Sequence, residues 1–61
     1  MKEIRKIRLL RELSLDDIFL RTRIPISKLS RIERGIYQAS AEEKRKIAKA
    51  LKTPEKEVFP D

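Results

Sequence analysis

The 61-residue sequence contains neither cysteine nor histidine, so it lacks the side chains for disulfides, for thiolate or imidazole metal sites and for thiol- or histidine-based catalysis. Its single glycine, Gly35, excludes the glycine-rich loops that hold nucleotide phosphates. No apolar run approaches the roughly 18 residues that a membrane span needs, and charged residues rather than a hydrophobic signal segment follow Met1. We therefore expect a soluble, cytoplasmic protein with no membrane partner, no metal, no cofactor and no evident small-molecule ligand.

The charge that is present is mostly positive and lies mostly in the first half of the chain. Sixteen Lys and Arg against ten Asp and Glu give a net charge of +6. Residues 1–34 contribute ten basic and five acidic side chains, whereas residues 35–61 contribute six and five. A local basic excess favours attraction to nucleic-acid phosphates through counterion release. A charged fraction of 43% equally suits the ion-paired surface of a heat-adapted protein, so composition alone does not choose between these two interpretations.

Apolar spacing and capping signals predict an all-α chain that folds as a single domain over residues 1–61. Ile4 and Ile7, followed by Leu10 or Arg11, predict an amphipathic first helix over about 3–12. A chain this short has room for one core only, which all the helices must share.

Two further helices are predicted on either side of a short turn. Ser14 with Asp17 three residues later resembles a capping box and predicts a helix over 15–22. Pro25 ends that helix and begins the next one, over 26–34, which Gly35 closes in a left-handed conformation. The turn between the two helices is three residues long, from Arg23 to Pro25.

The C-terminal third predicts two more helices. Ser40 and Glu43 form a capping box for a helix over 41–51, and Thr53 and Pro54 begin a short one over 54–59. This last helix carries Val58 and Phe59, for which we expect a place in the core rather than in a dimer contact.

The segment "LSLDDIFLRTRIPISKLSRIERG" and the later "EEKRKIAKALKTPEKEVFP" resemble the Cro/C1-type helix-turn-helix of phage repressors and the Xre family of bacterial regulators. The most specific pieces are "SRIERG" and "KIAKAL", and the resemblance covers about Ile4 to Pro60. It implies a five-helix, lambda-repressor-like domain that binds specific double-stranded DNA sequences as a small transcriptional regulator, most simply a repressor. It also implies a homodimer on a pseudo-palindromic operator.

The resemblance implies that the helix over 26–34 enters the major groove and that its first residues read base edges. The matching positions are Ile26, Ser27 and Arg31, with Pro25 beside them. Arg31 has the side chain for a bidentate contact to guanine, although it equally suits a solvated helix surface. Ser27 is suited to a base, a phosphate or the helix cap, and Ile26 to a thymine methyl group only.

Other positions match residues that hold the DNA backbone in relatives. Leu15 can offer only its backbone N–H, and Tyr37 is as well suited to a core or surface aromatic role. Arg21 and Arg34 are also basic, but we favour Arg23 and Lys28 as phosphate contacts. The expected phosphate-binding residues are Ser14, Leu15, Arg23, Lys28, Tyr37 and Gln38.

The resemblance further implies a partly buried ion pair between Arg8 and Glu33, which would join the first helix to the third. Such a pair orients the elements it connects more than it stabilises them.

Several positions depart from the pattern of the relatives and support a second hypothesis. Arg23 replaces the usual turn glycine, Phe19 replaces a small residue, and Leu15, Leu20 and Ile36 are apolar where polar residues are common. An exposed apolar patch of Leu15, Phe19, Leu20 and Ile26 would indicate a domain repurposed to bind protein.

An enzyme is the third hypothesis, and the sequence gives it little support. Asp16 and Asp17 are adjacent in the first turn of a predicted helix, where carboxylates stabilise the helix dipole. No companion base or nucleophile accompanies them, so we expect no enzymatic activity.

Overall fold

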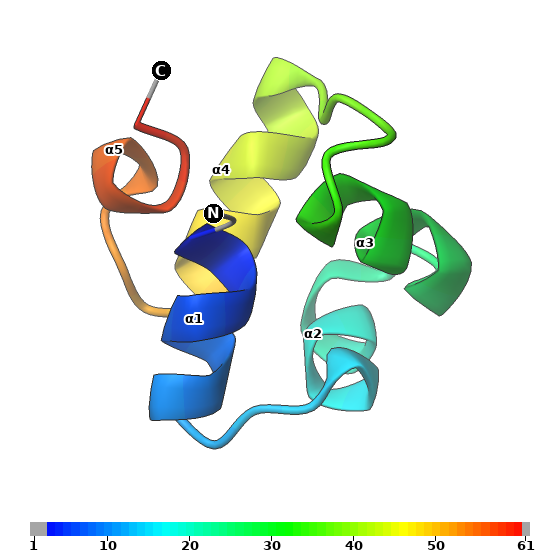
Figure 1. The fold of residues 1–61 in the computed structure, drawn as a ribbon. Coiled ribbons are helices and arrows are strands. Elements are labelled where there is room, and N and C mark those ends of the chain that lie inside the picture. The colour runs from blue at the N-terminus through cyan, green and yellow to red at the C-terminus, as the bar shows by residue number, and fades with distance from the viewer. Residues whose placement is uncertain (1–2, 61) are drawn as a thin grey trace.

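The structure is a computed structural model that describes residues 3–60. Figure 1 shows α-helices connected by short turns, and residues 3–60 contain no β-strand. The helices are α1 (Glu3–Leu10), α2 (Leu15–Thr22), α3 (Ile26–Glu33), α4 (Ala41–Ala50) and α5 (Glu55–Val58). The predicted all-α, five-helix class is therefore confirmed. Within these residues no helix combines the length and the apolar character that crossing a membrane requires.

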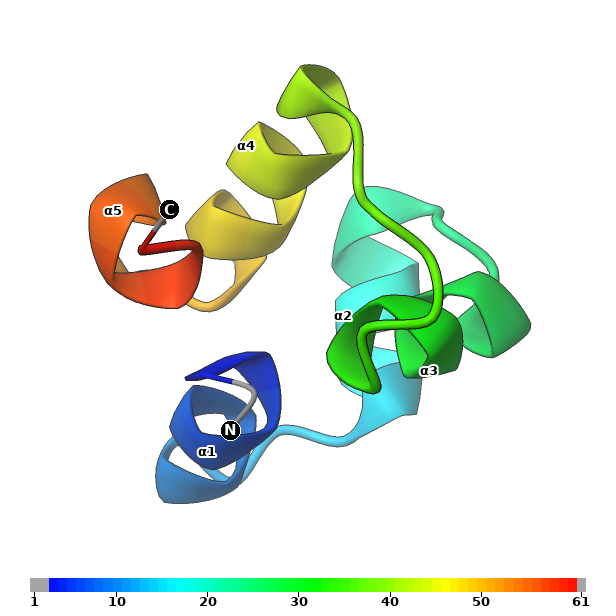
Figure 2. The ribbon, with the colours of Figure 1, turned by 45° about the horizontal axis from the view of Figure 1, so that its top comes forward.

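The helices pack around one another so that α3 lies at the edge of the molecule. α2 contacts both α3 and α4, while α1 contacts α3 and α5. In Figures 1 and 2, α4 lies between α5 on one side and the α2–α3 pair on the other. One face of α3 therefore packs on the other helices, and its opposite face has no helix over it (Figure 2).

A single apolar core holds the helices together. Ile18 of α2, Ile47 of α4 and Leu51 after α4 are its most deeply buried large side chains. The other buried apolar residues are Ile4, Ile24, Leu29, Ile32, Ala39, Ala48, Ala50 and Val58. Val58 belongs to this cluster, so its expected core placement is confirmed. Phe59 is partly buried and packs at the margin of the core.

Both predicted capping boxes are present. The Ser14 backbone N–H donates to Asp17 Oδ2 at 2.8 Å, and the Asp17 N–H donates to Ser14 Oγ at 3.2 Å. The Ser40 N–H donates to Glu43 Oε1 at 2.9 Å, and the Glu43 N–H donates to Ser40 Oγ at 3.2 Å. The bond from the Ser14 backbone N–H is the main cause that lowers the pKa of Asp17 below 3.8. Each box satisfies two N–H groups and fixes where its helix begins.

Three helices, α1, α3 and α4, end in the same type of turn, and each ends earlier than predicted. After each helix one residue adopts a left-handed conformation: Glu12 at φ 56°, Gly35 at φ 77° and Lys52 at φ 53°. The next N–H then turns back to a carbonyl in the last turn, as from Leu13 to Arg8 at 2.9 Å. This Schellman-type turn ends α1 at Leu10 rather than 12.

The other four ends differ by a single residue. Arg34 and Leu51 are the C-caps of α3 and α4, so these helices end at 33 and 50. Pro54 and Phe59 are the caps of α5 and not part of it.

The inward face of α1 also differs from the prediction. Ile4 is buried and Ile7 partly buried, but Leu10 is 75% exposed and Arg11 is exposed as well. Arg11 Nε donates to Thr53 Oγ1 at 3.1 Å across the surface. Leu10 comes six residues after the buried Ile4, which places it about 120° around the helix and off the buried face.

Candidate nucleic-acid interface

The turn between α2 and α3 is held by backbone and side-chain hydrogen bonds. Arg23 adopts a left-handed conformation at φ 64°, and its N–H donates to the Phe19 carbonyl at 2.6 Å. Thr22 Oγ1 donates to the Ile18 carbonyl at 2.8 Å and accepts from the Ile24 N–H at 3.1 Å. Since Thr22 and Ile24 are both buried, the three residues 23–25 set a fixed angle between the two helices.

α3 has one buried face and one exposed polar face. Leu29 and Ile32 are buried in the core, whereas Ser27 and Arg31 are exposed. Residues four apart lie above one another on a helix, so Ser27 and Arg31 share one strip of the outer face. Ile26, 38% exposed, lies at the first helical position after the Pro25 N-cap, which makes no side-chain capping bond.

The ion pair between Arg8 and Glu33 ties α3 to α1. Arg8 Nε donates to Glu33 Oε2 at 2.7 Å, and Arg8 Nη2 donates to Oε1 at 3.4 Å. Arg8 Nη1 also donates to the Leu13 carbonyl at 3.0 Å. The two side chains are only 11% and 7% exposed, so water screens their charges little. The contact holds the inner face of α3 against α1.

Lys28, which we favour as a phosphate contact, lies on a different side of α3 from Ser27 and Arg31. Its Nζ lies 2.7 Å from Glu43 Oε2 and 4.8 Å from the centre of the Tyr37 ring. Lys28 lies about 100° around the helix from Ser27, on the flank next to α4, where Glu43 caps the first turn. This contact engages Lys28 within the domain, and its expected role as a phosphate contact stays a prediction.

The electrostatics of this contact are those of a charged pair. The carboxylate of Glu43 and, after it, the side chain of Tyr37 raise the pKa of Lys28 above 10.5. Lys28 and then the Ser40 N–H lower the pKa of Glu43 below 4.5. Both groups are thus ionised around neutral pH.

The comparison with protein families agrees with this geometry. A family model described as helix-turn-helix matches residues 4–58. The chain belongs to the Cro/C1-type helix-turn-helix family. This is a DNA-binding helix-turn-helix family of the Xre type, and it is not known for enzymatic activity. Searches of curated proteins and of solved structures returned no significant match.

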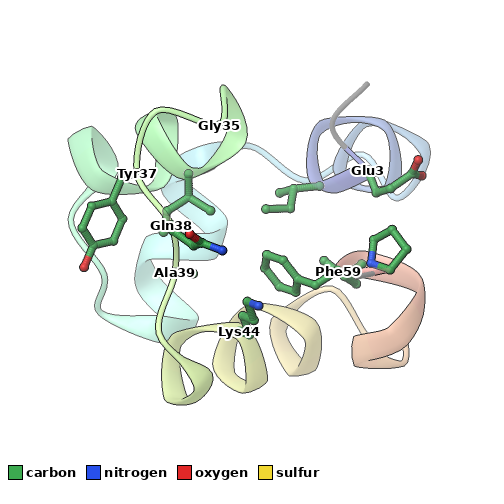
Figure 3. A pocket seen from close by; sticks show the side chains of 11 residues that line it. Glu3, Gly35, Tyr37, Gln38, Ala39, Lys44 and Phe59 are labelled. Carbon is green, nitrogen blue, oxygen red and sulfur yellow. The ribbon is translucent and has the colours of Figure 1, made fainter.

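The loop after α3 sends its two polar residues in different directions. Tyr37 lies beside the helix-turn-helix because its ring covers the Lys28 ammonium group. Gln38 lines a hollow of about 440 Å³ formed with residues of α1, α4 and the C-terminal segment. Tyr37 lines the same hollow, and in Figure 3 its ring extends outward from the rim while Gln38 points inward. Tyr37 also contacts α3, since its N–H donates to the Arg31 carbonyl at 3.2 Å and its ring covers Lys28.

The arginines around the helix-turn-helix differ in their contacts within the domain. Arg21 Nη1 donates to the Ala50 carbonyl at 2.8 Å and so caps the end of α4. Arg23 is exposed at the turn, with its guanidinium carbon 5.8 Å from the centre of the Phe19 ring. Arg34 is exposed at the end of α3. This supports the preference for Arg23 over Arg21 as a phosphate contact.

The start of α2 offers backbone rather than side-chain donors. The Ser14 hydroxyl accepts the capping bond and lies 3.1 Å from Asp17 Oδ2. Leu15 is the first helical residue, so its N–H has no acceptor within the helix. Its side chain packs partly buried on the core.

The apolar residues proposed as a protein-binding patch are not all exposed. Leu15 and Phe19 pack against the core, while Leu20 is 60% exposed and Ile26 is exposed at the start of α3. Half of the expected patch is therefore used within the domain, and the structure does not favour the protein-binding hypothesis.

One contact of the helix-turn-helix was not predicted. The capping pattern in the sequence predicts only a helix-capping role for Glu43, whereas in the structure Glu43 also contacts Lys28. The two residues belong to different helices, so no local spacing signals their contact.

Proposed function

We propose that this chain binds specific sequences of double-stranded DNA and regulates transcription, most simply by repressing it, through occupancy of its site. The observation that supports this most directly is the exposed strip of Ser27 and Arg31 on α3. The inner face of the same helix is fixed by the core and by the Arg8–Glu33 pair. A rigid helix that carries a bidentate hydrogen-bond donor on its free face suits the major groove.

In the proposed complex, α3 lies in the major groove along its outer strip from Ile26 to Arg31. Arg31 donates both guanidinium branches to guanine O6 and N7, Ser27 bonds to a base or a phosphate, and Ile26 contacts a thymine methyl group. Family membership supports the general mode of binding, and the exposure of these side chains supports the individual assignments.

Contacts to the phosphates would set the position of α3 in the groove. The proposed donors are the free N–H groups at the start of α2, the exposed Arg23 at the turn and Tyr37 in the loop after α3. We further propose that two copies bind a pseudo-palindromic operator whose half-sites lie about one helical turn apart.

The test is a titration of labelled duplex DNA at several salt concentrations, with a preferred duplex selected from a random pool. We expect the affinity to fall steeply with salt. Arg31→Ala should remove about 1–3 kcal/mol of preference for the selected duplex and affect random duplex less. Arg45→Ala is the matched control: it removes the same charge from an exposed residue on α4.

Two results would contradict the proposal. One is a result in which Arg31→Ala, like Arg45→Ala, lowers the affinity for the selected duplex and for random duplex by the same factor. The other is the absence of salt-dependent binding by the unaltered chain.

A further inference from the structure

The carboxylate of Glu43 makes two contacts at the border between α3 and α4. Oε1 accepts the Ser40 N–H at 2.9 Å, which completes the capping box of α4. Oε2 lies 2.7 Å from Lys28 Nζ, while the Tyr37 ring covers the same ammonium group at 4.8 Å. The cap fixes the carboxylate in place, so Glu43 offers Lys28 a prepared anionic position on α4.

We propose that Glu43 is an intramolecular substitute for a DNA phosphate, which holds Lys28 on α4 in the free protein and releases it to the DNA backbone when α3 docks. This proposal rests on the proposed function. It makes Glu43 a residue that sets DNA affinity, although Glu43 itself touches no DNA.

The strength of the pair suits such an exchange. The Lys28 side chain is 36% exposed and that of Glu43 17%, so water reaches the ammonium group and the pair is weaker than a fully buried one. Lysine carries its charge on a flexible four-carbon stem, so the ammonium group can change partner without movement of the α3 backbone. A phosphate contact in the complex gains the entropy of counterion release, which Glu43 does not supply.

The position of Lys28 supports the same exchange. Lys28 directly follows Ser27 in the first turn of α3, the helix proposed to lie in the groove. Tyr37, a proposed phosphate contact, already touches the ammonium group. A phosphate that reached Tyr37 would therefore arrive beside Lys28.

A purely structural bridge between α3 and α4 is the competing interpretation, and a double-mutant cycle separates the two. The proteins are the unaltered chain, Glu43→Gln, Lys28→Gln and the double variant. Glutamine at the third helical position preserves a capping box, so Glu43→Gln removes the charge and keeps the helix start. Glu42→Gln is the matched control, because Glu42 is the adjacent residue and pairs at 3.6 Å with Lys46 on the exposed side of α4.

Affinity for duplex DNA is measured for each protein across a series of salt concentrations. We expect Glu43→Gln to bind about two- to five-fold more tightly than Glu42→Gln, since docking no longer has to break an exposed pair. That excess should vanish when Lys28 is also glutamine. Lys28→Gln should lower the slope of log affinity against log salt by about 0.9, because one phosphate contact is lost.

The outcomes distinguish the two proposals. An unchanged salt slope in Lys28→Gln, or an excess in Glu43→Gln that persists without Lys28, overturns the exchange and leaves the DNA-binding proposal standing. Absence of salt-dependent binding by all five proteins overturns both.

Discussion

At the scale of single residues, the Arg8–Glu33 pair is the polar contact on which the position of α3 depends most. Its two side chains are nearly buried and share hydrogen bonds at 2.7 and 3.4 Å. We expect Glu33→Ala to lower the free energy of unfolding by about 3–5 kcal/mol, because it leaves the Arg8 charge buried without its partner. Chemical denaturation at low temperature measures this, and DNA affinity should fall with it.

The double variant Arg8→Met/Glu33→Met is the control for this prediction. Replacing both charges by apolar side chains of similar size removes the stranded charge, so much of the lost stability should return. A melting temperature that Glu33→Ala leaves unchanged would contradict the role assigned to the pair.

At the scale of helices, the shared ending of α1, α3 and α4 leads to a second prediction. All three use a left-handed residue, but only α3 places glycine there. A side chain with a Cβ atom is strained in this conformation, and glycine is not. We expect Lys52→Gly to raise the free energy of unfolding by about 1 kcal/mol.

Lys52→Ala is the matched control, because alanine also loses the lysine charge but keeps the strained Cβ atom. It should bring no comparable gain. If thermal unfolding found Lys52→Gly no more stable than Lys52→Ala, the strain assigned to this turn would be absent.

The same endings explain which parts of the helices the sequence predicts. The starts of α2 and α4 follow from a serine and an acidic residue three positions later, a pattern confined to one turn. At the end of α1 the left-handed position is taken by Glu12 rather than by a glycine. No residue there marks a helix end, so the sequence predicts a helix that is too long. The end of α3 is marked by Gly35 and was placed within one residue.

The candidate site divides in a similar way. The outward strip of Ser27 and Arg31 follows from helical spacing once Leu29 and Ile32 are assigned to the core. The contact between Lys28 and Glu43 depends on how the loop after α3 returns the chain to α4, and on the reach of a flexible side chain. Neither is encoded in a local pattern, so the sequence predicted a phosphate contact for Lys28 but not its pairing with Glu43.

At the scale of the whole molecule, the size of the domain limits how two copies can meet on DNA. The Cα trace of the domain spans 25 × 22 × 20 Å, whereas half-sites one helical turn apart have centres about 34–36 Å from each other. Two copies in adjacent grooves can therefore touch only at their margins. A marginal contact buries far less than the roughly 1,600 Å² of a typical stable interface.

We therefore expect the 61-residue chain to sediment as a monomer at micromolar concentration without DNA and to bind a two-half-site duplex as a pair. The duplex holds the two copies at a high local concentration, and this allows the marginal contact between them to form. Sedimentation velocity with duplexes of one half-site, of two, and of two separated by about half a helical turn more measures this. The altered spacing should abolish cooperative binding, since it rotates the second copy to the opposite face of the duplex. A stable dimer without DNA, or cooperativity that ignores the spacing, would show that the copies associate through a larger surface than the proposed arrangement allows.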